Sequence, residues 1–408
     1  MVLKGDGEKK IEELAYFGGS PIFLEPKSTS CLAQPDFESF LNYSKQFFDL
    51  RYYSNNGVLV KQLEERLAGV PDAKFCVTFC SGFWALVLTI STLSLKGKTE
   101  IVMPSLTYRR MADIAAWAKL KPRFCEVNTN TLALDSQTAS ECINNETALI
   151  LAVHPIVNCC EVGGILSLGA DKDIPVLFDS VESMFESSAN GKIGSFGDAE
   201  CFSMHASKLL NGFEGGYVTT NNHKLARKLS LLRSFGFEGQ DNCVVPGALN
   251  AKLNEIHAAM ALANLDELDK VVTANLRNYR CYQSGLKSIR GIQLLDFDES
   301  YNTSYKNIVV EVLDEWPLSR DLTIEILNAE NILARAYYST PLHSKKMSYP
   351  HIPTTLKITD TLAKKFMLLP CGEFVRCDDI KKIVRFLGFI SSHSIELSMY
   401  LTKKNSYE

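Results

Sequence analysis

Lys208 is the residue in this sequence whose type and position most clearly predict chemistry. It ends the segment Phe202-Ser203-Met204-His205-Ala206-Ser207-Lys208, which overlaps a strand-like run at residues 199–203. Asp179 directly follows an apolar run, residues 174–178, that is typical of a buried strand. In open α/β sheets the carboxyl ends of the strands carry the ligand-contacting groups, so the amine and the carboxylate are expected to face one crevice. A lysine in such a crevice can form a Schiff base.

Other segments contain candidates for the remaining parts of a pyridoxal phosphate site. Besides the amine, such a site needs an anion for the ring nitrogen, donors for the phosphate and faces that hold the ring. The strand-to-helix turn at residues 80–84 contains Gly82 and Phe83, and a helix N-terminus there would favour a dianion. Ser203 adds a hydroxyl, and Tyr108, just past a strand edge, is a candidate for stacking on the ring. The pattern predicts pyridoxal phosphate.

Each of these residues, taken alone, has an ordinary structural explanation. A lysine after a strand is most often a solvated surface charge. An aspartate such as Asp179 is as often a helix cap or turn former, and the turn at Gly82 is also what begins many helices. A lone tyrosine such as Tyr108 is more often a core or surface aromatic. The prediction therefore depends on the order and context of the residues together.

Strand-like and helix-like segments alternate from residue 57 to about residue 222, and they are the elements that must position these groups. This alternation predicts a largely parallel sheet with helices on both faces. A glycine turn at residues 212–216 leads into one further strand and lets the backbone pass close to a bulky ligand. The expected strands are residues 75–79, 100–103, 122–127, 148–153, 176–179 and 199–203, and the expected helices include residues 84–95 and 111–120.

The C-terminal part of the sequence predicts a smaller α+β domain. A long helical pattern at residues 254–280 is expected to link it to the larger domain. Strands are expected at residues 308–312 and 332–334, and helices at residues 322–328 and 377–387. The expected division is residues 1–56 as an N-terminal arm and segment packing with the small domain, 57–255 as the large cofactor-binding domain, 256–400 as linker helix and small domain, and 401–408 as a polar tail.

The composition is that of an ordinary soluble globular protein, with 408 residues, 46% apolar and 22% charged. A net charge of −4 disfavours nucleic acid as a partner. No apolar run approaches the roughly 18 to 20 residues that span a bilayer, and the first ten residues lack a signal-peptide core, so we expect no membrane partner and a cytoplasmic location. The twelve cysteines lie mostly in apolar strand-like segments without metal-ligand spacing, which predicts buried reduced thiols and no metal site.

Together these segments resemble the DegT/DnrJ family of sugar-nucleotide aminotransferases, which are fold-type I pyridoxal phosphate enzymes. The resemblance covers most of the chain and implies an α/β fold with a mostly parallel seven-stranded sheet flanked by helices, plus a smaller α+β C-terminal domain. It is carried by residues 80–86, 103–108, 178–182, 194–208, 214–216 and 250–255.

The resemblance also implies a role for individual residues. Lys208 matches the lysine that forms the Schiff base, and Asp179 matches the partner of the ring nitrogen. Asn250 matches a residue that reaches the phosphate from the neighbouring subunit, which implies a homodimer with shared sites. The other expected contacts are Tyr108 stacking on the ring, Gly82, Phe83 and Ser203 at the phosphate, Glu182 near the ring hydroxyl, His343 lining the substrate pocket, and Lys252, Arg109 or Arg110 at a substrate diphosphate.

Three positions depart from the family pattern. Phe83 stands where threonine is usual, so only backbone donors to the phosphate remain. Glu182 stands where glutamine is usual, and a carboxylate there is expected to repel the phenolate oxygen of the cofactor unless it is protonated or turned away. Met184 replaces a common histidine. These departures bear on the substrate more than on the cofactor, because Lys208 and Asp179 are both present.

The leading functional hypothesis is a transaminase that moves an amino group from L-glutamate to a keto-sugar nucleotide, such as a dTDP-4-keto-6-deoxyhexose, to give a 4-amino-4,6-dideoxy sugar for glycan, O-antigen or natural-product biosynthesis. Two alternatives stay open. One is another pyridoxal phosphate enzyme, either a dehydratase or an aminotransferase for a non-nucleotide ketone such as a keto-cyclitol; related dehydratases have histidine in place of the lysine, so Lys208 argues against the former. The other is a regulatory protein that keeps the cofactor pocket, which the low basicity supports little.

Overall fold

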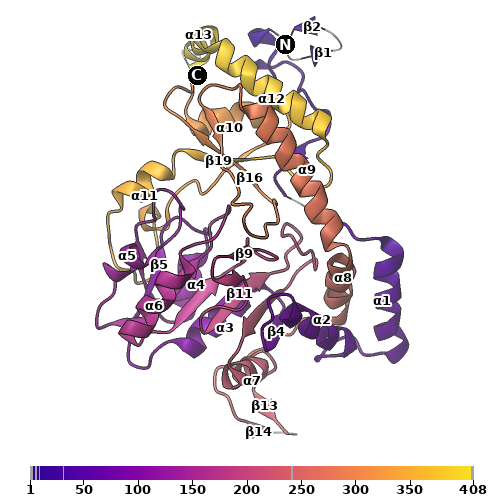
Figure 1. The fold of residues 1–408 in the computed structure, drawn as a ribbon, viewed down its shortest axis with the longest axis vertical. Coiled ribbons are helices and arrows are strands. Elements are labelled where there is room, and N and C mark those ends of the chain that lie inside the picture. Colours follow the sequence, from indigo (N-terminus) through magenta and orange to yellow (C-terminus); the bar gives the residue numbers. More distant parts are fainter. Residues whose placement is uncertain (1–2, 5–6, 9, 31, 240–241, 406–408) are drawn as a thin grey trace.

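Seven strands form a central sheet in the lower, larger part of the molecule (Figure 1). The structure is a computed structural model that describes residues 3–4, 7–8, 10–30, 32–239 and 242–405. The strand order is β4-β12-β11-β8-β7-β5-β6, and only β12 runs antiparallel to its neighbours in this sheet. The predicted mostly parallel seven-stranded sheet is confirmed. Its strands are β4 (Phe75–Phe79), β5 (Glu100–Pro104), β6 (Lys121–Cys125), β7 (Thr147–Val153), β8 (Val176–Asp179), β11 (Ala199–Ser203) and β12 (Gly216–Thr220).

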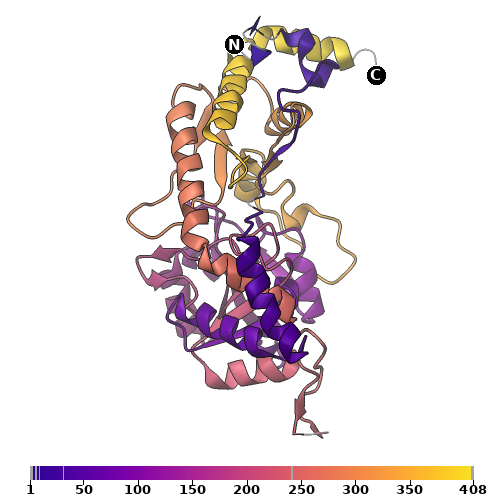
Figure 2. The ribbon, with the colours of Figure 1, turned by 90° about the vertical axis from the view of Figure 1, so that its right-hand side faces the viewer.

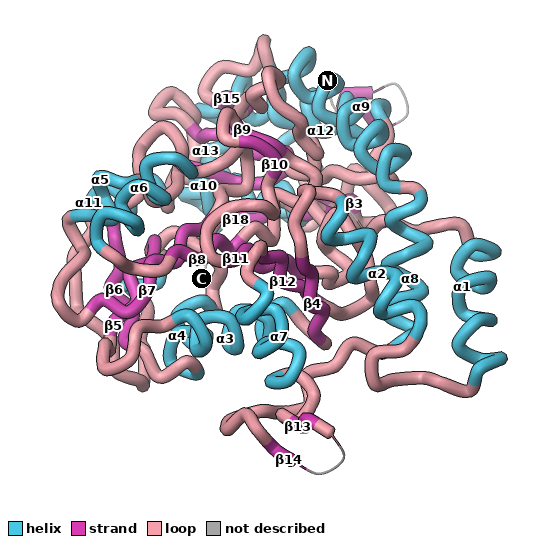
Figure 3. The backbone as a smooth tube through the Cα atoms, turned by 60° about the horizontal axis from the view of Figure 1, so that its bottom comes forward, coloured by secondary structure: helices cyan, strands magenta, loops and turns pink. Residues whose placement is uncertain are grey.

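Helices cover both faces of this sheet because its central strands are apolar on both sides. Along β5, Ile101 and Met103 join the hydrophobic cluster under α3, α4 and α7, while Val102 between them joins the cluster under α5 and α6. Figure 3 shows α3, α4 and α7 together along one side of the strands. The helices of this part are α2 (Val58–Gly69), α3 (Gly82–Leu93), α4 (Met111–Trp117), α5 (Ser136–Ser140), α6 (Val162–Lys172), α7 (His223–Leu232) and α8 (Glu255–Asp266).

A four-stranded antiparallel sheet, in the order β15-β16-β19-β18, forms the smaller part of the molecule. Its apolar face packs with the helices into a separate hydrophobic core that includes Tyr279, Tyr282, Ile308 and Phe386. The α+β character predicted for this region is confirmed. Its elements are α9 (Leu268–Leu286), β15 (Ile292–Leu294), β16 (Ile308–Val312), α10 (Arg320–Ala329), β17 (Ile332–Leu333), β18 (Arg335–Ala336), β19 (Phe366–Leu369), α12 (Cys377–Ser392) and α13 (Ser394–Asn405).

The helical pattern at residues 254–280 forms two helices, α8 and α9, that run from the larger part to the smaller one (Figure 1). The break falls at Glu267, whose backbone has φ −107° and ψ 14° and whose N–H donates to Asn264 O at 3.2 Å. The expectation of one long helix was therefore wrong at this residue. The two helices still form the predicted connection between the two parts.

The N-terminal segment is shared between the two parts. Near the start, Glu330 of the smaller part accepts hydrogen bonds from Ala15 N at 2.7 Å and Ile22 N at 2.9 Å. Further on, β3 pairs in parallel with β17, and α1 packs against α8. The exact domain boundaries stay a prediction. The elements of this segment are β1 (Leu3–Lys4), β2 (Gly7–Glu8), η1 (Ile11–Glu13), η2 (Ala15–Phe17), β3 (Lys27–Ser28) and α1 (Phe37–Leu50).

Two cysteines differ from the predicted reduced state. Cys281 of α9 and Cys377, the first residue of α12, form a disulfide with their Cα atoms 5.9 Å apart. The two helices pack side by side, which brings together cysteines that are 96 residues apart in the chain. The cysteines of the apolar strand-like segments are free thiols, as predicted, and Cys125, Cys160 and Cys201 among them are fully buried.

The remaining elements lie outside the two sheets and their helices. In Figures 1 and 2 the hairpin of β13 and β14 extends away from the rest of the molecule beyond α7. The predicted polar tail is helical up to Asn405, because Leu401 packs against the core of the smaller part; residues 406–408 lie outside the described residues. In the described part of the chain, no helix combines the length and the apolarity needed to cross a membrane. These other elements are β9 (Ser187–Ser188), β10 (Gly191–Lys192), β13 (Phe237–Glu238), β14 (Asn242–Cys243), η3 (Leu342–Ser344) and α11 (Lys357–Leu362).

Candidate functional site

Lys208 lies in the connection between the antiparallel strands β11 and β12, residues 204–215, which we call the Lys208 loop. Two pairs of backbone groups close this loop where it leaves and rejoins the sheet. Met204 N donates to Gly215 O at 2.8 Å, and Ala206 N donates to Phe213 O at 3.0 Å. Lys208 N itself donates to His205 O at 2.8 Å. The backbone that carries the amine is therefore held by the sheet.

The Lys208 amine contacts a carboxylate that has a second ammonium partner. Lys208 Nζ donates to Glu182 Oε1, and Lys306 Nζ donates to Glu182 Oε2 at 2.6 Å. Asn307 Nδ2 lies 3.4 Å from the same Oε2. Lys306 is only 3% exposed and lies two residues before β16 of the smaller part. Glu182 thus contacts one ammonium group from each part of the molecule, Lys208 from the larger part and Lys306 from the smaller part.

The two ammonium groups decide the charge of Glu182. Burial alone would raise the pKa of this carboxyl, but Lys208 and Lys306 together hold its pKa well below the usual value. For Lys208, burial lowers the pKa of the amine, the nearby Glu182 opposes this, and Lys306 adds to the lowering. The carboxylate has two cations beside it, whereas Lys208 shares its anion with a second cation. Glu182 is therefore ionised and paired with two cations; the repulsion of a phenolate oxygen expected for an unpaired carboxylate at this position stays untested.

Asp179 ends β8 and is a buried carboxylate that forms no salt bridge with the residues that the structure describes. It is 5% exposed, and among the described residues it accepts one hydrogen bond, from Val181 N at 3.2 Å. Burial raises its pKa to about 7, although the Val181 N–H and the charge of Lys208 act in the opposite direction. A protonated ring nitrogen would supply the partner that this carboxylate lacks. The site fits pyridoxal phosphate at this point.

The N-terminus of α3 forms the candidate phosphate site. Ser81 is its N-cap, and its Oγ accepts from Trp84 N at 3.3 Å. A Cβ added to Gly82 would lie 3.0 Å from Ser203 Cβ, and one added to Gly216 would lie 2.4 Å from Gly82 N. The first turn of α3, Ser203 and β12 therefore meet closely only because two glycines are present. The Ser203 hydroxyl accepts from His205 N at 3.3 Å and keeps its own proton free to donate to a phosphate.

The side chains of Phe83 and Met184 pack into hydrophobic clusters, so we expect them to contact neither the phosphate nor the ring of the cofactor. Phe83 packs against the cluster under α3, with its ring 5.7 Å from that of Trp84 in a T-shaped arrangement. Met184 is 5% exposed and belongs to the hydrophobic cluster around α2 and α8. At residue 83 only the backbone N–H is thus left for a phosphate, and its contact with a phosphate stays a prediction.

Tyr108, Arg109 and His343 lie around the end of β5. Tyr108 is 46% exposed and follows the strand by four residues. His343 reaches the same place from the C-terminal part, because its Nδ1 lies 2.8 Å from Ser105 Oγ. Arg109 is exposed; burial and then the charge of this arginine lower the pKa of Lys345. By contrast, Arg110 pairs with Asp113 at 3.1 Å and is less available to a ligand.

Asn250 and Lys252 are not brought to Lys208 of the same chain. Lys252 Nζ donates to Asn250 Oδ1 at 2.6 Å and lies 4.2 Å from the centre of the Phe235 ring. Among the described residues, no hydrogen bond or ion pair links either side chain to Lys208, Asp179 or Ser203. Asn250 is exposed next to the β13–β14 hairpin. Its predicted contact with the phosphate of a neighbouring subunit stays a prediction.

Lys306 and Asn307 were missed by the sequence analysis although both lie at Glu182. The available signal was a polar pair directly before the apolar run of residues 308–312. Asn307 is 1% exposed, and its Oδ1 has no hydrogen-bond partner among the described residues. No group of three or more histidine, cysteine, aspartate or glutamate residues in the described ranges has the arrangement of a metal site.

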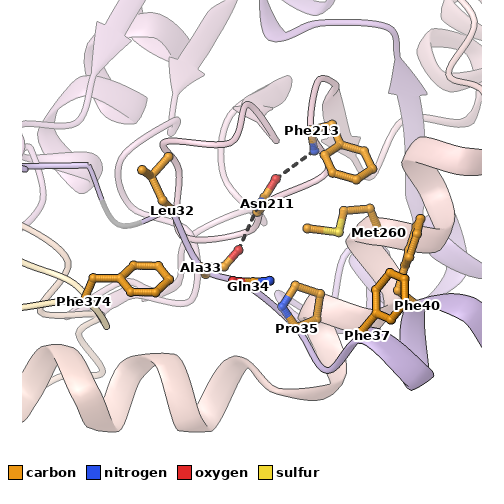
Figure 4. A pocket seen from close by; sticks show the side chains of 10 residues that line it. All are labelled: Leu32, Ala33, Gln34, Pro35, Phe37, Phe40, Asn211, Phe213, Met260 and Phe374. Carbon is orange, nitrogen blue, oxygen red and sulfur yellow. Dashed lines mark hydrogen bonds between the residues drawn. The ribbon is translucent and has the colours of Figure 1, made fainter.

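An apolar pocket of about 440 Å³ lies beside the Lys208 loop (Figure 4). Phe37 and Phe40 of α1, Phe213 of the loop and Met260 of α8 point into it. Asn211 fixes its wall, with Nδ2 donating to Ala33 O and Oδ1 accepting from Phe213 N, both at 2.8 Å. None of the residues that line it is charged. This pocket does not suit a phosphate or a diphosphate.

Comparisons with known proteins agree with this geometry. The model of the DegT/DnrJ/EryC1/StrS aminotransferase family matches residues 37–387. The dTDP-4-amino-4,6-dideoxy-D-glucose transaminase of Shigella dysenteriae is 27% identical over 354 residues, which cover 86% of this chain and 95% of that protein. GDP-perosamine synthase of Vibrio cholerae is 24% identical, with 84% and 93% covered.

Two solved structures show the same fold. DesI, whose structure was determined in the presence of its TDP-sugar product, has a TM-score of 0.88 at 29% identity, with 96% of this chain and 100% of that chain covered. Helicobacter pylori PseC, an aminotransferase involved in the biosynthesis of pseudoaminic acid, has a TM-score of 0.81 at 22% identity, with 89% and 98% covered.

Proposed function

Because this chain belongs to the DegT/DnrJ/EryC1/StrS aminotransferase family and is a pyridoxal phosphate-dependent sugar aminotransferase, we propose that it transfers an amino group from L-glutamate to a nucleotide-linked keto-sugar. The expected acceptor is a dTDP-4-keto-6-deoxyhexose, which would give a 4-amino-4,6-dideoxy sugar. The observation that carries the proposal is that Lys208 and Asp179 lie at one edge of the sheet, beside the close contact between Gly82 of α3 and Ser203.

The proposed residue roles follow from this placement. When bound, pyridoxal phosphate supplies a carbonyl carbon that accepts the amino group and a ring that withdraws electrons from the reacting carbon. Lys208 would hold the cofactor and carry protons at its Nζ, for which its lowered pKa is suited. Asp179 would keep a proton on the ring nitrogen. The Gly82 and Phe83 N–H groups and the Ser203 hydroxyl would bind the phosphate, and Tyr108 would cover the ring.

The rim of the site suits an anionic substrate. Arg109 is exposed beside Tyr108, and Lys345 lies near enough for the arginine to lower its pKa. Two like charges held together are favourable when a diphosphate lies between them. We therefore assign Arg109 to the diphosphate of the sugar nucleotide. His343, tied to Ser105 beside this loop, is assigned to the wall of the sugar site.

The proposal includes a homodimer in which each subunit completes the site of the other. Asn250 and Lys252 lie on an exposed face next to the β13–β14 hairpin, and they have no role in their own site. Apolar side chains are exposed on the surface near the apolar pocket, for example Phe37 at 64% and Phe213 at 42%. The proposal further includes a cytoplasmic location, which the nine free cysteines of the described residues support.

The decisive experiment combines spectroscopy with a substrate panel. The purified protein is expected to show the visible absorbance of bound pyridoxal phosphate and to lose it when L-glutamate is added. The glutamate-treated enzyme is then offered dTDP-, UDP- and GDP-linked 4-keto and 3-keto sugars and a keto-cyclitol, with amine products detected by mass. Amination of the keto-cyclitol alone would replace the nucleotide sugar as substrate, and a stable absorbance with every amino donor would indicate a binding protein.

A further inference from the structure

Glu182 and Lys306 form a buried ion pair at the edge of the cofactor site. Lys306 is 3% exposed, and its Nζ lies 2.6 Å from Glu182 Oε2. An ammonium group this deeply buried is costly unless a charge of opposite sign faces it. Glu182 is the partner that the described residues provide. Nothing in the proposed roles of the other site residues explains why the chain keeps this second lysine.

The role of Lys306 follows from what happens to Lys208 during catalysis. Glu182 contacts both lysines, one through each carboxylate oxygen. Lys208 must change its protonation and its bonding in order to hold the cofactor and to move protons. Whenever Lys208 gives up its positive charge, Lys306 is the cation that still faces Glu182. The carboxylate then remains ionised and paired, and it does not repel a cofactor oxygen beside it with a full negative charge.

We propose that Lys306 is a positioning residue that acts through Glu182. The two side chains form a fixed, electrically neutral unit, and this unit determines the pH at which Lys208 and its bound cofactor lose a proton. This inference rests on the assigned cofactor and not on the identity of the sugar acceptor. It also gives the smaller part of the molecule a direct role in the chemistry, since Lys306 precedes β16 whereas Glu182 follows β8.

Among the other titratable groups that face this pair, two tyrosines stay neutral over the useful pH range, whereas Glu186 and, in the cofactor-free protein, Asp179 have a pKa of about 7. Burial, together with the charge of Glu182, raises the pKa of Tyr337 and of Tyr338, which are therefore neutral. Burial raises the pKa of Glu186 to about 7, and Ser304 Oγ donates to its carboxylate at 2.8 Å. Asp179 lies on the side of Lys208, and the protonated ring nitrogen of a bound cofactor would balance its charge.

A charge-neutralising pair of mutations tests the proposal without any sugar or amino donor. The measured quantity is the pH midpoint at which the visible absorbance of the bound cofactor changes. Lys306→Met leaves one negative charge beside Lys208 and is expected to raise this midpoint by about one to two pH units. Glu182→Gln leaves one positive charge and is expected to lower it by a similar amount. The double variant restores neutrality and is expected to return to within about half a unit of the wild type.

The thermal stability of the protein without cofactor provides a second readout. Glu182→Gln leaves two buried ammonium groups without their shared anion, so its melting temperature is expected to fall, and the double variant, which removes one of these ammonium groups, is expected to recover part of the loss. In Lys306→Met, Lys208 still faces Glu182, so the melting temperature is expected to fall less. Lys306→Arg should keep the wild-type midpoint, because it preserves the charge. Lys365→Met is the matched control and should not move the midpoint. Lys365 also forms an ion pair with a glutamate, since its Nζ lies 3.5 Å from Glu311 Oε1 of β16, but this pair is away from the site.

The outcomes separate the possible errors. An unchanged midpoint in Lys306→Met, or a double variant whose melting temperature falls by the full sum of the two single losses, would overturn the role of Lys306. If the sugar panel fails while the midpoints shift as described, only the proposed acceptor is wrong. If the wild-type protein binds no cofactor, the melting temperatures of the two single variants and the double variant still decide whether Glu182 and Lys306 act as one unit.

Discussion

The inner wall of the site and its outer rim are built on different principles. On the inner wall, Asp179 and Lys306 are 5% and 3% exposed, and they sit at the ends of strands in the two sheets. On the rim, Tyr108 is 46% exposed, and Arg109 and Asn250 are exposed on loops. On the wall, Lys306 is paired with Glu182, and Asp179 is a candidate partner for the ring nitrogen of the cofactor. On the rim, the charged group of Arg109 is exposed to water.

This difference separates the chemistry of the site from the choice of its substrate. A buried charge is costly when its partner is removed, so changes on the wall should affect the cofactor and the reaction strongly. An exposed charge is screened by water, so changes on the rim should alter affinity by smaller factors. The wall is therefore expected to be common to many acceptors, and the rim is where an acceptor is recognised.

The largest effect is expected at Lys208. Lys208→Ala should lower the transamination rate by about 10⁴-fold or more and abolish the visible absorbance of the bound cofactor, since its Nζ both holds the cofactor and carries protons. Stopped-flow absorbance with L-glutamate checks this. Lys192→Ala is the control, because Lys192 is exposed and pairs with Asp72 at 2.7 Å. A Lys208→Ala protein that kept the absorbance would show that Lys208 does not hold the cofactor.

Asp179→Asn is expected to lower the rate by about 10²- to 10³-fold, because an amide cannot hold the ring nitrogen protonated as a carboxylate does. The same change should have an opposite effect on the cofactor-free protein. Folding raises the pKa of Asp179 from 3.8 to about 7, so between about pH 4 and pH 7 the folded protein keeps a proton that the unfolded chain has lost. The free energy of unfolding is therefore highest at low pH and falls as the pH rises through this range.

Cofactor-free Asp179→Asn should therefore be more stable than the wild type at pH 8, by on the order of 2 kcal/mol, and its stability should depend less on pH. Urea unfolding between pH 4 and pH 8 measures both quantities. A variant that is less stable than the wild type at pH 8 would show that the buried carboxylate has a partner that the described contacts do not include.

Asn250→Asp tests whether the rim belongs to two subunits. The new carboxylate should weaken cofactor binding by about 10²-fold, because it would face the phosphate dianion. Mixed dimers of Asn250→Asp with Lys208→Ala should contain one intact site and therefore be more active than the sum of the two variants. Asn242→Asp, on β14, is the control. No gain of activity on mixing would place Asn250 outside the partner's site.

The smallest effect is expected at Arg109. Arg109→Ala should raise the KM for the nucleotide sugar by about 10-fold and leave kcat within about 2-fold, because an exposed cation contributes to binding and not to the reacting atoms. Arg110→Ala should have less effect on KM, since Arg110 already pairs with Asp113 at 3.1 Å. Equal effects of both changes would mean that the diphosphate does not distinguish the two arginines.

The wall could be predicted from the sequence where local pattern and function coincide. The strands at residues 75–79, 176–179 and 199–203 were predicted with correct ends, because each is an apolar run with a turn or a polar residue at its end. Helix α6 was not predicted, since Gly163, Gly164 and Gly169 weaken its helical pattern.

Lys306 could not have been found in this way. Its partner Glu182 lies 124 residues earlier in the chain, and no local pattern marks a lysine as buried. For the same reason the sequence offered only protonation or reorientation for Glu182, whereas the structure pairs it with two cations. The Cys281–Cys377 disulfide also depends on the packing of α9 with α12, which the spacing of the cysteines does not reveal.

The reversed direction of β12 has a consequence for motion. Because β11 and β12 are antiparallel neighbours, the chain that carries Lys208 returns directly to the edge of the sheet from which it left. A parallel return would need the chain to cross over to the opposite end of the strands, and the lysine would then move with the packing of that crossover segment. Here the amide protons of Met204 and Ala206 are hydrogen-bonded to the carbonyl oxygens of Gly215 and Phe213, so they should exchange slowly with solvent.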